Sequence, residues 1–482
     1  TLTYLDGSGN DFDQASLMIA LLRASGYTGQ YVFGTMTILG TTLSNWLGVN
    51  QIAQAIGTVL ASGGIPIDAL WSDGGAQFRR VWVKATIDGV DYVFDPAFKS
   101  YTYTDKIDLG QVMSYSRNGL MAAVNSGATV TADYAQNMNE ANLRSMLSTY
   151  ASNLVNTIRT NYPNKNVDDI IGGRKIVQTN LIGYQTSLPG TITAQWSDIP
   201  SEYTTTLRIQ HAGIDYTFNT ADLAGKRLTL THAAGAGNRP EIRLDGALVV
   251  FGNATTIGSI NNLTITIDHP YAANNGTYCD QTVIYTPESG RNYAIVYNFG
   301  GISDALIRKR QQQLETYRLQ GLSDTTEAVL GETLNVMGQT WLAEYLVTGR
   351  LTCQLAETTL TIHHSVGLVA QEAGYYIDVK ALFVSFCSRH GIDIDEIQGF
   401  KVTALVGSAF EHGILEQLMG SDKPAVSTMK LFQIANSTGR KMYHVTQANS
   451  ASILGVNANC SDTIEQIRST YSCSDITGFR YA

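Results

Sequence analysis

The first hundred residues constrain the fold of this chain most, because they predict one helix followed by three strands. Four apolar residues there recur at i, i+3, i+4 and i+7, the spacing of one helix face: Leu17, Ala20, Leu21 and Ala24. Asn10 or Asp11 can cap the start of this helix, and Gly26 ends it. The β-rich segment 30–38, closed by a glycine, is the first predicted strand.

Two further strands are predicted over residues 79–87 and 91–99, on either side of the turn Asp88-Gly89. An Asp-Gly pair between two alternating segments is a strong hairpin signal. A helix followed by three strands is also the order in which a papain-like thiol enzyme presents its three catalytic positions.

This part of the chain resembles the bacterial transglutaminase-like domain. The family motifs are a Cys-x-Asp-x-Ala helix start, a His-x-Trp-x-Glu strand and an Asp-Pro strand. Asp13 and Ala15 match the first motif, Trp82 the second, and Asp95-Pro96 the third. Three further stretches are similar to the family: residues 20–26, 45–49 and 95–101. The resemblance implies an α+β papain-like core.

The catalytic residues of the family are replaced in this sequence. The nucleophile position holds Asp11 in place of Cys, and the general-base position holds Arg80 in place of His. No Cys precedes Cys279 and no His precedes His211, so a small shift of the alignment does not restore the pair. Thiol chemistry needs a thiolate beside an imidazole, and an arginine keeps its proton near neutral pH. We therefore predict a degenerate site without catalytic residues.

The substituted positions suggest a charge cluster. Asp11, Arg80 and Asp95 could form a permanent carboxylate–guanidinium–carboxylate triad in place of the family's thiolate and imidazolium. In the alternative interpretation, Arg79 and Arg80 are two solvated residues beside a strand. A structure that places Arg80 in solvent, far from both carboxylates, would exclude the triad.

The remaining sequence predicts an α+β chain of several domains. Residues 140–162 predict an amphipathic helix with four residues on one face: Leu143, Leu147, Leu154 and Ile158. Short alternating segments between 191 and 299 predict a β-sandwich or barrel. We expect a transglutaminase-like core at 1–105, a helical extension at 106–185, a β-sandwich at 186–300 and a mixed α/β region at 301–482.

The cysteines and histidines predict no metal or cofactor site. The chain has five cysteines without a CxxC pair: Cys279, Cys353, Cys387, Cys460 and Cys473. Cys460 and Cys473 are the best candidates for a disulfide, and Cys387 is expected to be a buried thiol. His412 and Glu416 have the i, i+4 spacing of a metal pair on a helix, but no third ligand is evident. The adjacent His363 and His364 would point to opposite faces of a strand.

Composition excludes several kinds of partner. The net charge is −9 and no basic stripe appears, which disfavours nucleic-acid binding. The run Arg308-Lys309-Arg310 is better explained as an exposed helix face than as a polyanion site. No apolar run approaches the roughly 18 residues of a membrane span, so we expect no membrane insertion. Only 15% of the residues are charged, and Ser, Thr, Asn and Gln take their place, as is common in exported bacterial proteins.

The later segments are similar to regions of large secreted or surface proteins of the Rhs/YD-repeat kind. Segments 331–341 and 427–436 carry this similarity. It implies an extracellular or cell-surface structural segment whose partners are other protein chains or flanking domains, with a homo-oligomer or filament as a possible assembly. Two alternatives stay open: an enzyme that uses a non-thiol site in the same cleft for crosslinking or hydrolysis, and a carbohydrate- or peptide-binding module.

Overall fold

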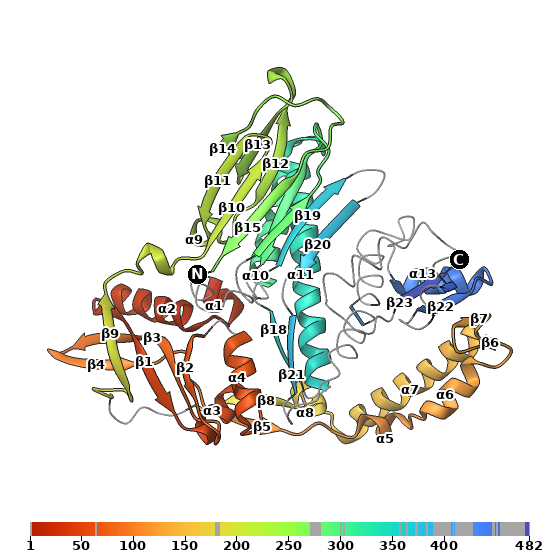
Figure 1. Cartoon of the computed structure of the whole chain (residues 1–482), viewed down its shortest axis with the longest axis horizontal. Helices are drawn as coiled ribbons and strands as arrows, with labels where there is room; N and C mark the ends of the chain where they lie inside the picture. Colours follow the sequence, from red (N-terminus) through yellow and green to blue (C-terminus); the bar gives the residue numbers. More distant parts are fainter. Residues whose placement is uncertain are drawn as a thin grey trace. The chain divides into compact units, whose positions relative to one another are not determined.

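The structure is a computed structural model, and the chain divides in it into two compact units. Unit 1 comprises Thr1–Tyr103 and Arg174–Thr403, and unit 2 comprises Thr104–Gly173 and Ala404–Ala482 (Figure 1). Both units combine helices with antiparallel sheets, so the chain is an α+β protein of more than one domain. The residues described are 2–62, 65–178, 184–269, 281–298, 301, 304–355, 358–362, 365–371, 375–381, 384–388, 406–407, 409, 428–445, 449, 452–453 and 478–481.

The N-terminal part of unit 1 is built on a five-stranded antiparallel sheet of order β2-β3-β1-β9, in which β4 also pairs with β3. Its elements are α1 (Leu2–Asp6), α2 (Asp11–Ala24), β1 (Thr28–Ile38), α3 (Gly40–Leu47), α4 (Ala53–Ser62), β2 (Ile67–Leu70), β3 (Ala76–Ile87), β4 (Val90–Phe94) and β9 (Gly190–Trp196). The predicted helix and the first two predicted strands are thus confirmed as α2, β1 and β3. The strand predicted at 91–99 is confirmed only as far as Phe94, where β4 ends, and the chain turns at residues 96–97.

Local sequence explains where these elements begin and end. Asn10 caps α2: its side chain accepts a hydrogen bond from the Asp13 N–H, and the Asp13 carboxylate accepts one from the Asn10 N–H. The β3–β4 turn has positive φ at both central residues, 51° at Asp88 and 79° at Gly89. This is the backbone that a two-residue hairpin with the right-handed strand twist requires.

Two apolar layers enclose this sheet. Phe12, Ala15 and Ile19 of α2 pack on one face against Val81 and Val83 of β3. The other face packs against α3 and α4 through a second cluster of buried residues: Leu43, Ala55, Ile56, Leu60 and Phe78. These layers bury both faces of β3, the strand that carries Arg80.

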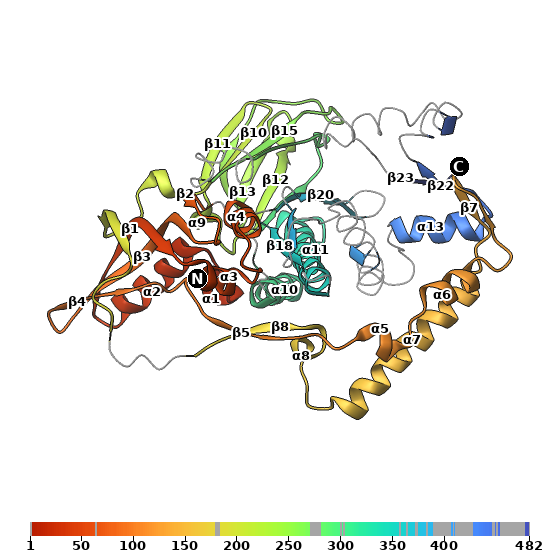
Figure 2. The same ribbon diagram turned by 60° about the horizontal axis from the view of Figure 1, so that its bottom comes forward.

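The following part of unit 1 consists of two antiparallel sheets around one core. The four-stranded sheet has the order β11-β10-β15-β16 and the six-stranded sheet the order β14-β13-β12-β17-β19-β20. Their strands are β10 (Thr206–His211), β11 (Ile214–Asn219), β12 (Leu228–Ala233), β13 (Arg239–Leu244), β14 (Ala247–Phe251), β15 (Leu263–Asp268), β16 (Gln281–Tyr285), β17 (Tyr293–Asn298), β19 (Ser365–Gln371) and β20 (Tyr375–Ala381). Alternate residues of both sheets form a single hydrophobic cluster, and Figure 2 shows the sheets as separate layers.

Three strands pair with strands that lie in a different expected domain. β9 lies in the range 186–300 but pairs with β1 of the N-terminal sheet. β19 and β20 lie in the range 301–482 but extend the six-stranded sheet, because β19 pairs with β17. The four-part division stays a prediction, and these pairings join parts of the chain that it assigns to different domains.

Two helices complete the described part of unit 1 beside a two-stranded sheet of β18 (Thr358–Ile362) and β21 (Val384–Ser388). They are α10 (Asp304–Leu319) and α11 (Glu327–Leu355). α11 packs on the six-stranded sheet through Leu334 and Leu342. Gly338 permits this close contact, because a Cβ atom there would lie 2.7–2.8 Å from Val296 and Val369.

Unit 2 contains short helices around one long helix, and a small sheet of order β23-β22-β7-β6. Its elements are α5 (Leu109–Met113), α6 (Arg117–Val124), β6 (Thr129–Val130), β7 (Tyr134–Gln136), α7 (Glu140–Asn161), α8 (Val167–Ile171), α13 (Thr428–Ser437), β22 (Met442–Val445) and β23 (Gly478–Tyr481). The helix predicted at 140–162 is confirmed as α7. Its predicted buried face is wrong at Leu147, which is 51% exposed, whereas Tyr150 is buried. No helix in the described ranges has the length and hydropathy of a membrane-spanning segment.

Candidate functional site

The three residues that the sequence resemblance singled out, Asp11, Arg80 and Asp95, converge in unit 1. Asp11 is the first residue of α2, Arg80 lies on β3, and Asp95 directly follows β4. β4 pairs with β3 from Val83 to Ile87, and the start of α2 lies against β3. The fold therefore brings a helix N-terminus and two adjacent strands to one place.

Arg80 and Asp95 form a buried ion pair. Their closest atoms, Nη2 and Oδ1, are 2.6 Å apart, and the two side chains are 1% and 9% exposed. Asp95 Oδ1 also accepts the backbone N–H groups of Ala97 at 3.2 Å and Phe98 at 3.1 Å. Arg79 instead lies at the surface and pairs with Asp68. The interpretation of Arg80 as a solvated residue is therefore wrong, although it holds for Arg79.

Asp11 reaches the same strand one residue further along. Its Oδ2 atom accepts the backbone N–H of Val81 at 2.8 Å, and the residue is 8% exposed. At the first position of α2 its negative charge also interacts favourably with the helix dipole. Asp11 thus connects the start of α2 to β3. Of the predicted triad, the structure shows the Arg80–Asp95 pair, whereas this Asp11 oxygen accepts a backbone N–H group of the neighbouring residue.

An aromatic ring covers the guanidinium. The Cζ atom of Arg80 lies 4.6 Å from the ring centroid of Trp46 and 5.9 Å from that of Phe78. Trp46 Nε1 donates to the carbonyl of Ala97 at 3.2 Å. The Nε and Nη1 atoms of Arg80 have no hydrogen-bond partner among the described residues. Stacking and one carboxylate thus hold this cation.

Lys99 adds a second cation beside the pair. Its Nζ donates to Gln14 Oε1 and to the carbonyl of Pro96. Burial lowers the pKa of the Lys99 ammonium, the Asp95 carboxylate opposes this shift, and the Arg80 guanidinium adds to it. Sequence reasoning missed Lys99 and Trp46, because neither occupies a position of the three catalytic motifs.

The chemistry of this cluster is not that of a thiol enzyme. A buried guanidinium keeps its proton and cannot act as a general base. Asp11 is held by a backbone N–H group, and no cysteine precedes Cys279 in the sequence. The arrangement places charge at the three positions without a thiol nucleophile and an imidazole base.

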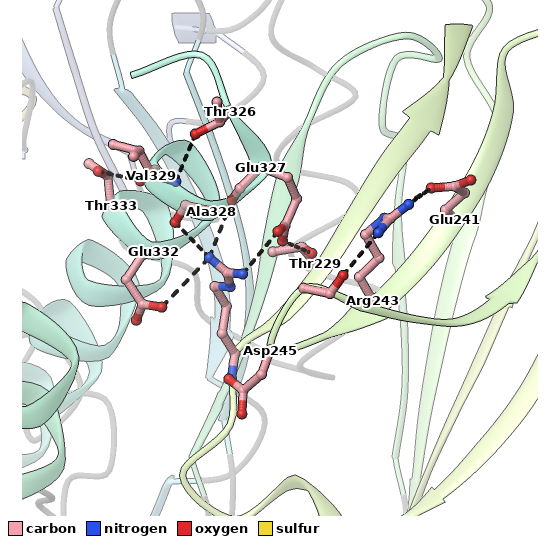
Figure 3. A network of polar contacts seen from close by, with 12 residues as sticks. Thr229, Glu241, Arg243, Asp245, Thr326, Glu327, Ala328, Val329, Glu332 and Thr333 are labelled. Atoms are coloured by element: carbon pink, nitrogen blue, oxygen red, sulfur yellow. Dashed lines mark hydrogen bonds and ion pairs between the residues drawn. The ribbon is translucent and has the colours of Figure 1, made fainter. Parts of the chain in front are cut away.

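A second buried charge cluster lies between β12 and the two long helices (Figure 3). Arg227, 1% exposed, pairs with Glu327 Oε2 at 2.9 Å and lies 3.6 Å from Glu332 Oε2. Its Nη1 also donates to the carbonyls of Glu327 and Ala328 at the start of α11. Thr229 donates its hydroxyl to Glu327 Oε1 at 2.8 Å. This cluster fixes the first turn of α11 on the six-stranded sheet.

Arg310 of α10 extends this second cluster. It pairs with Asp245 at 2.6 Å and with Glu332 at 3.4 Å. Burial raises the pKa of Glu332, and the nearby Arg310 and Arg227 oppose that shift. These residues were not predicted as a cluster; the signal in the sequence is Glu332, a carboxylate between the apolar residues Leu330 and Leu334. The run Arg308–Arg310 is not one basic surface, because Arg308 pairs with Asp304 and Arg310 turns into this cluster.

The other candidates from the sequence lie mostly outside the described residues. This applies to Cys279, Cys460, Cys473, His363, His364, His412 and Glu416. Cys353 is buried in α11, and Cys387 lies on β21. Where the chain is described, no three His, Cys, Asp or Glu side chains are grouped so that they could hold a metal ion.

Comparisons of the chain with protein-family models, with curated proteins and with solved structures found no match.

Proposed function

We propose that this chain is a non-catalytic structural segment of a large exported bacterial protein, built on a degenerate transglutaminase-like domain. The observation that carries the proposal is the buried Arg80–Asp95 pair at the place of the family's base and its orienting acid. A guanidinium fixed in this way supports packing and cannot take up a proton.

The geometry supports a papain-like core for the N-terminal part. The helix N-terminus with Asp11, the strand with Arg80 and the end of the next strand with Asp95 meet as the three catalytic positions of that fold would. The two sheets from β10 to β20 share one core and support a β-sandwich as the second module.

The partners we propose are other protein chains or flanking domains of the same polypeptide, including a homo-oligomer or filament. The surface composition supports export, since uncharged polar residues replace much of the usual charge. Light scattering and electron microscopy of the purified chain at increasing concentration measure self-association. A strictly monomeric protein would leave flanking domains as the partners.

The alternative is an enzyme that uses carboxylates in the same cleft. The test is a screen for amine incorporation and for amide and ester hydrolysis, performed with the wild-type chain and with Asp11→Ala. Asp91→Ala is the matched control, because Asp91 is an exposed carboxylate on β4 that pairs with Lys84. We expect no activity from any of the three proteins. Turnover that is lost in Asp11→Ala and retained in Asp91→Ala would overturn the structural proposal.

A further inference from the structure

We propose that the Arg80–Asp95 pair holds in place the two-stranded ribbon of β5 (Tyr101–Thr104) and β8 (Gly173–Ile176). The chain leaves unit 1 after Tyr103 and returns to it at Arg174, so each strand of this ribbon contains one crossing point. The inference rests on the proposed non-catalytic role of the site and gives the degenerate residues a function of their own.

The ion pair is bonded to the turn after β4. Asp95 Oδ1 accepts the Arg80 guanidinium at 2.6 Å and the N–H groups of Ala97 and Phe98 at 3.2 and 3.1 Å. One oxygen atom thus joins the buried cation to the backbone of this turn. Removal of Arg80 would leave the Asp95 carboxylate, which is only 9% exposed, without its cation.

The same turn is bonded to the end of α3. Trp46 donates its Nε1–H to the carbonyl of Ala97 at 3.2 Å, and its ring lies 4.6 Å from the Arg80 guanidinium. Trp46 is therefore held twice, once by the turn and once by the cation. Both contacts depend on the position of Arg80.

α3 is in turn bonded to the ribbon. The Asn45 side chain donates to the Tyr101 carbonyl and accepts the Tyr101 N–H, each at 3.0 Å. Arg174 Nη1 donates to the carbonyl of Trp46 at 3.0 Å, and its guanidinium lies 4.2 Å from the ring centroid of Tyr101. The Tyr103 hydroxyl donates to the carbonyl of Asn45. Both strands of the ribbon are thus fixed to two adjacent residues of α3.

The helix end is shaped for this contact. α3 ends at Gly48, which has φ of 75°, a backbone conformation that favours glycine. A Cβ atom at Gly48 would lie 3.2 Å from Tyr103 Oη and 3.3 Å from Arg174 Nη1. The ribbon therefore approaches α3 as closely as a glycine permits.

Hydrogen exchange measured by mass spectrometry on the full chain tests this inference. The reporters are the Tyr101 N–H, which Asn45 accepts, and the Val177 N–H, which donates to the Ser100 carbonyl at 2.9 Å. In Arg80→Met we expect the exchange of both to rise about tenfold or more, while β10 and β15 stay unchanged. Arg79→Met is the matched control, because Arg79 is the exposed neighbour on the same strand.

Trp46→Phe provides a second variant if Arg80→Met does not fold. Phenylalanine keeps an aromatic ring over the guanidinium but removes the Nε1–H that binds Ala97, so ribbon exchange should rise about threefold. The inference is overturned if ribbon exchange is unchanged in the folded variant, if it rises equally in Arg79→Met, or if β10 and β15 accelerate to the same extent. Exchange does not measure turnover, so this result and the activity screen can fail independently.

Discussion

Replacing Arg227 by methionine tests whether the second charge cluster stabilises the six-stranded sheet. The substitution keeps most of the aliphatic volume and removes a cation that is 1% exposed. Glu332, also 1% exposed, loses one of its two cations but keeps Arg310 at 3.4 Å. Glu327 is 23% exposed, so solvent compensates part of its loss.

Breaking a buried ion pair by removing one partner costs about 3–5 kcal/mol. We expect the lower end of this range, about 3 kcal/mol, because Glu332 retains Arg310. Since about 1.4 kcal/mol corresponds to a tenfold change, the amides of β12 and of the first turns of α11 should exchange roughly a hundredfold faster. Hydrogen exchange is the suitable assay, because it reports the opening of this module without assuming that the whole chain unfolds in two states.

The matched control is Arg208→Met, which breaks a surface pair. Arg208 and Asp215 are 47% and 51% exposed, and such pairs contribute about 0–1 kcal/mol. An effect of Arg227→Met no larger than that of Arg208→Met would refute the reasoning.

The pH dependence of the Arg227→Met variant gives a second check. Burial already raises the pKa of Glu332, and losing Arg227 removes one of the charges that oppose this shift. The folded variant then binds a proton more tightly than the unfolded chain does, so acidification stabilises it relative to wild type. The loss of stability of Arg227→Met relative to wild type should therefore become smaller as the pH falls. A loss that becomes larger at low pH would contradict this expectation.

Three further changes have defined outcomes. His211→Gln should flatten the rise of the unfolding free energy with pH below about 6.5. Burial lowers the pKa of His211, so in this pH range the unfolded chain binds a proton that the folded chain does not. Denaturation at several pH values measures the slope. Gly338→Ala should destabilise the module by about 1–3 kcal/mol in urea titrations, whereas Gly235→Ala, with open space around its Cβ, should not. Asn10→Ala should cost about 1 kcal/mol by removing the α2 cap, measured as faster amide exchange in that helix.

Local pattern predicted the elements around the site well. The i, i+3, i+4 spacing located α2, and the Asp88-Gly89 turn located the β3–β4 hairpin, because both signals lie within a few residues. The resemblance to a known family then identified Asp11, Arg80 and Asp95 as neighbours, although they are far apart in the sequence.

Contacts between distant segments could not be predicted in this way. β9 pairs with β1, and Arg227 pairs with Glu327 and shares Glu332 with Arg310, yet no periodicity relates these segments. The Leu147 prediction failed for a related reason. Hydrophobic spacing identifies an apolar side of α7 but does not show which part of that side a neighbouring element covers.

The late position of β9 has a consequence for biosynthesis. A ribosome must translate the whole segment 104–173 before it reaches β9. Until then, the edge of β1 that pairs with β9 has no partner strand in the nascent chain. Phe33, which stacks on Trp196 at 5.6 Å, lacks this aromatic partner during that interval. Expression of the first hundred residues alone should therefore yield an aggregating product, and adding back residues 184–203 should improve its solubility.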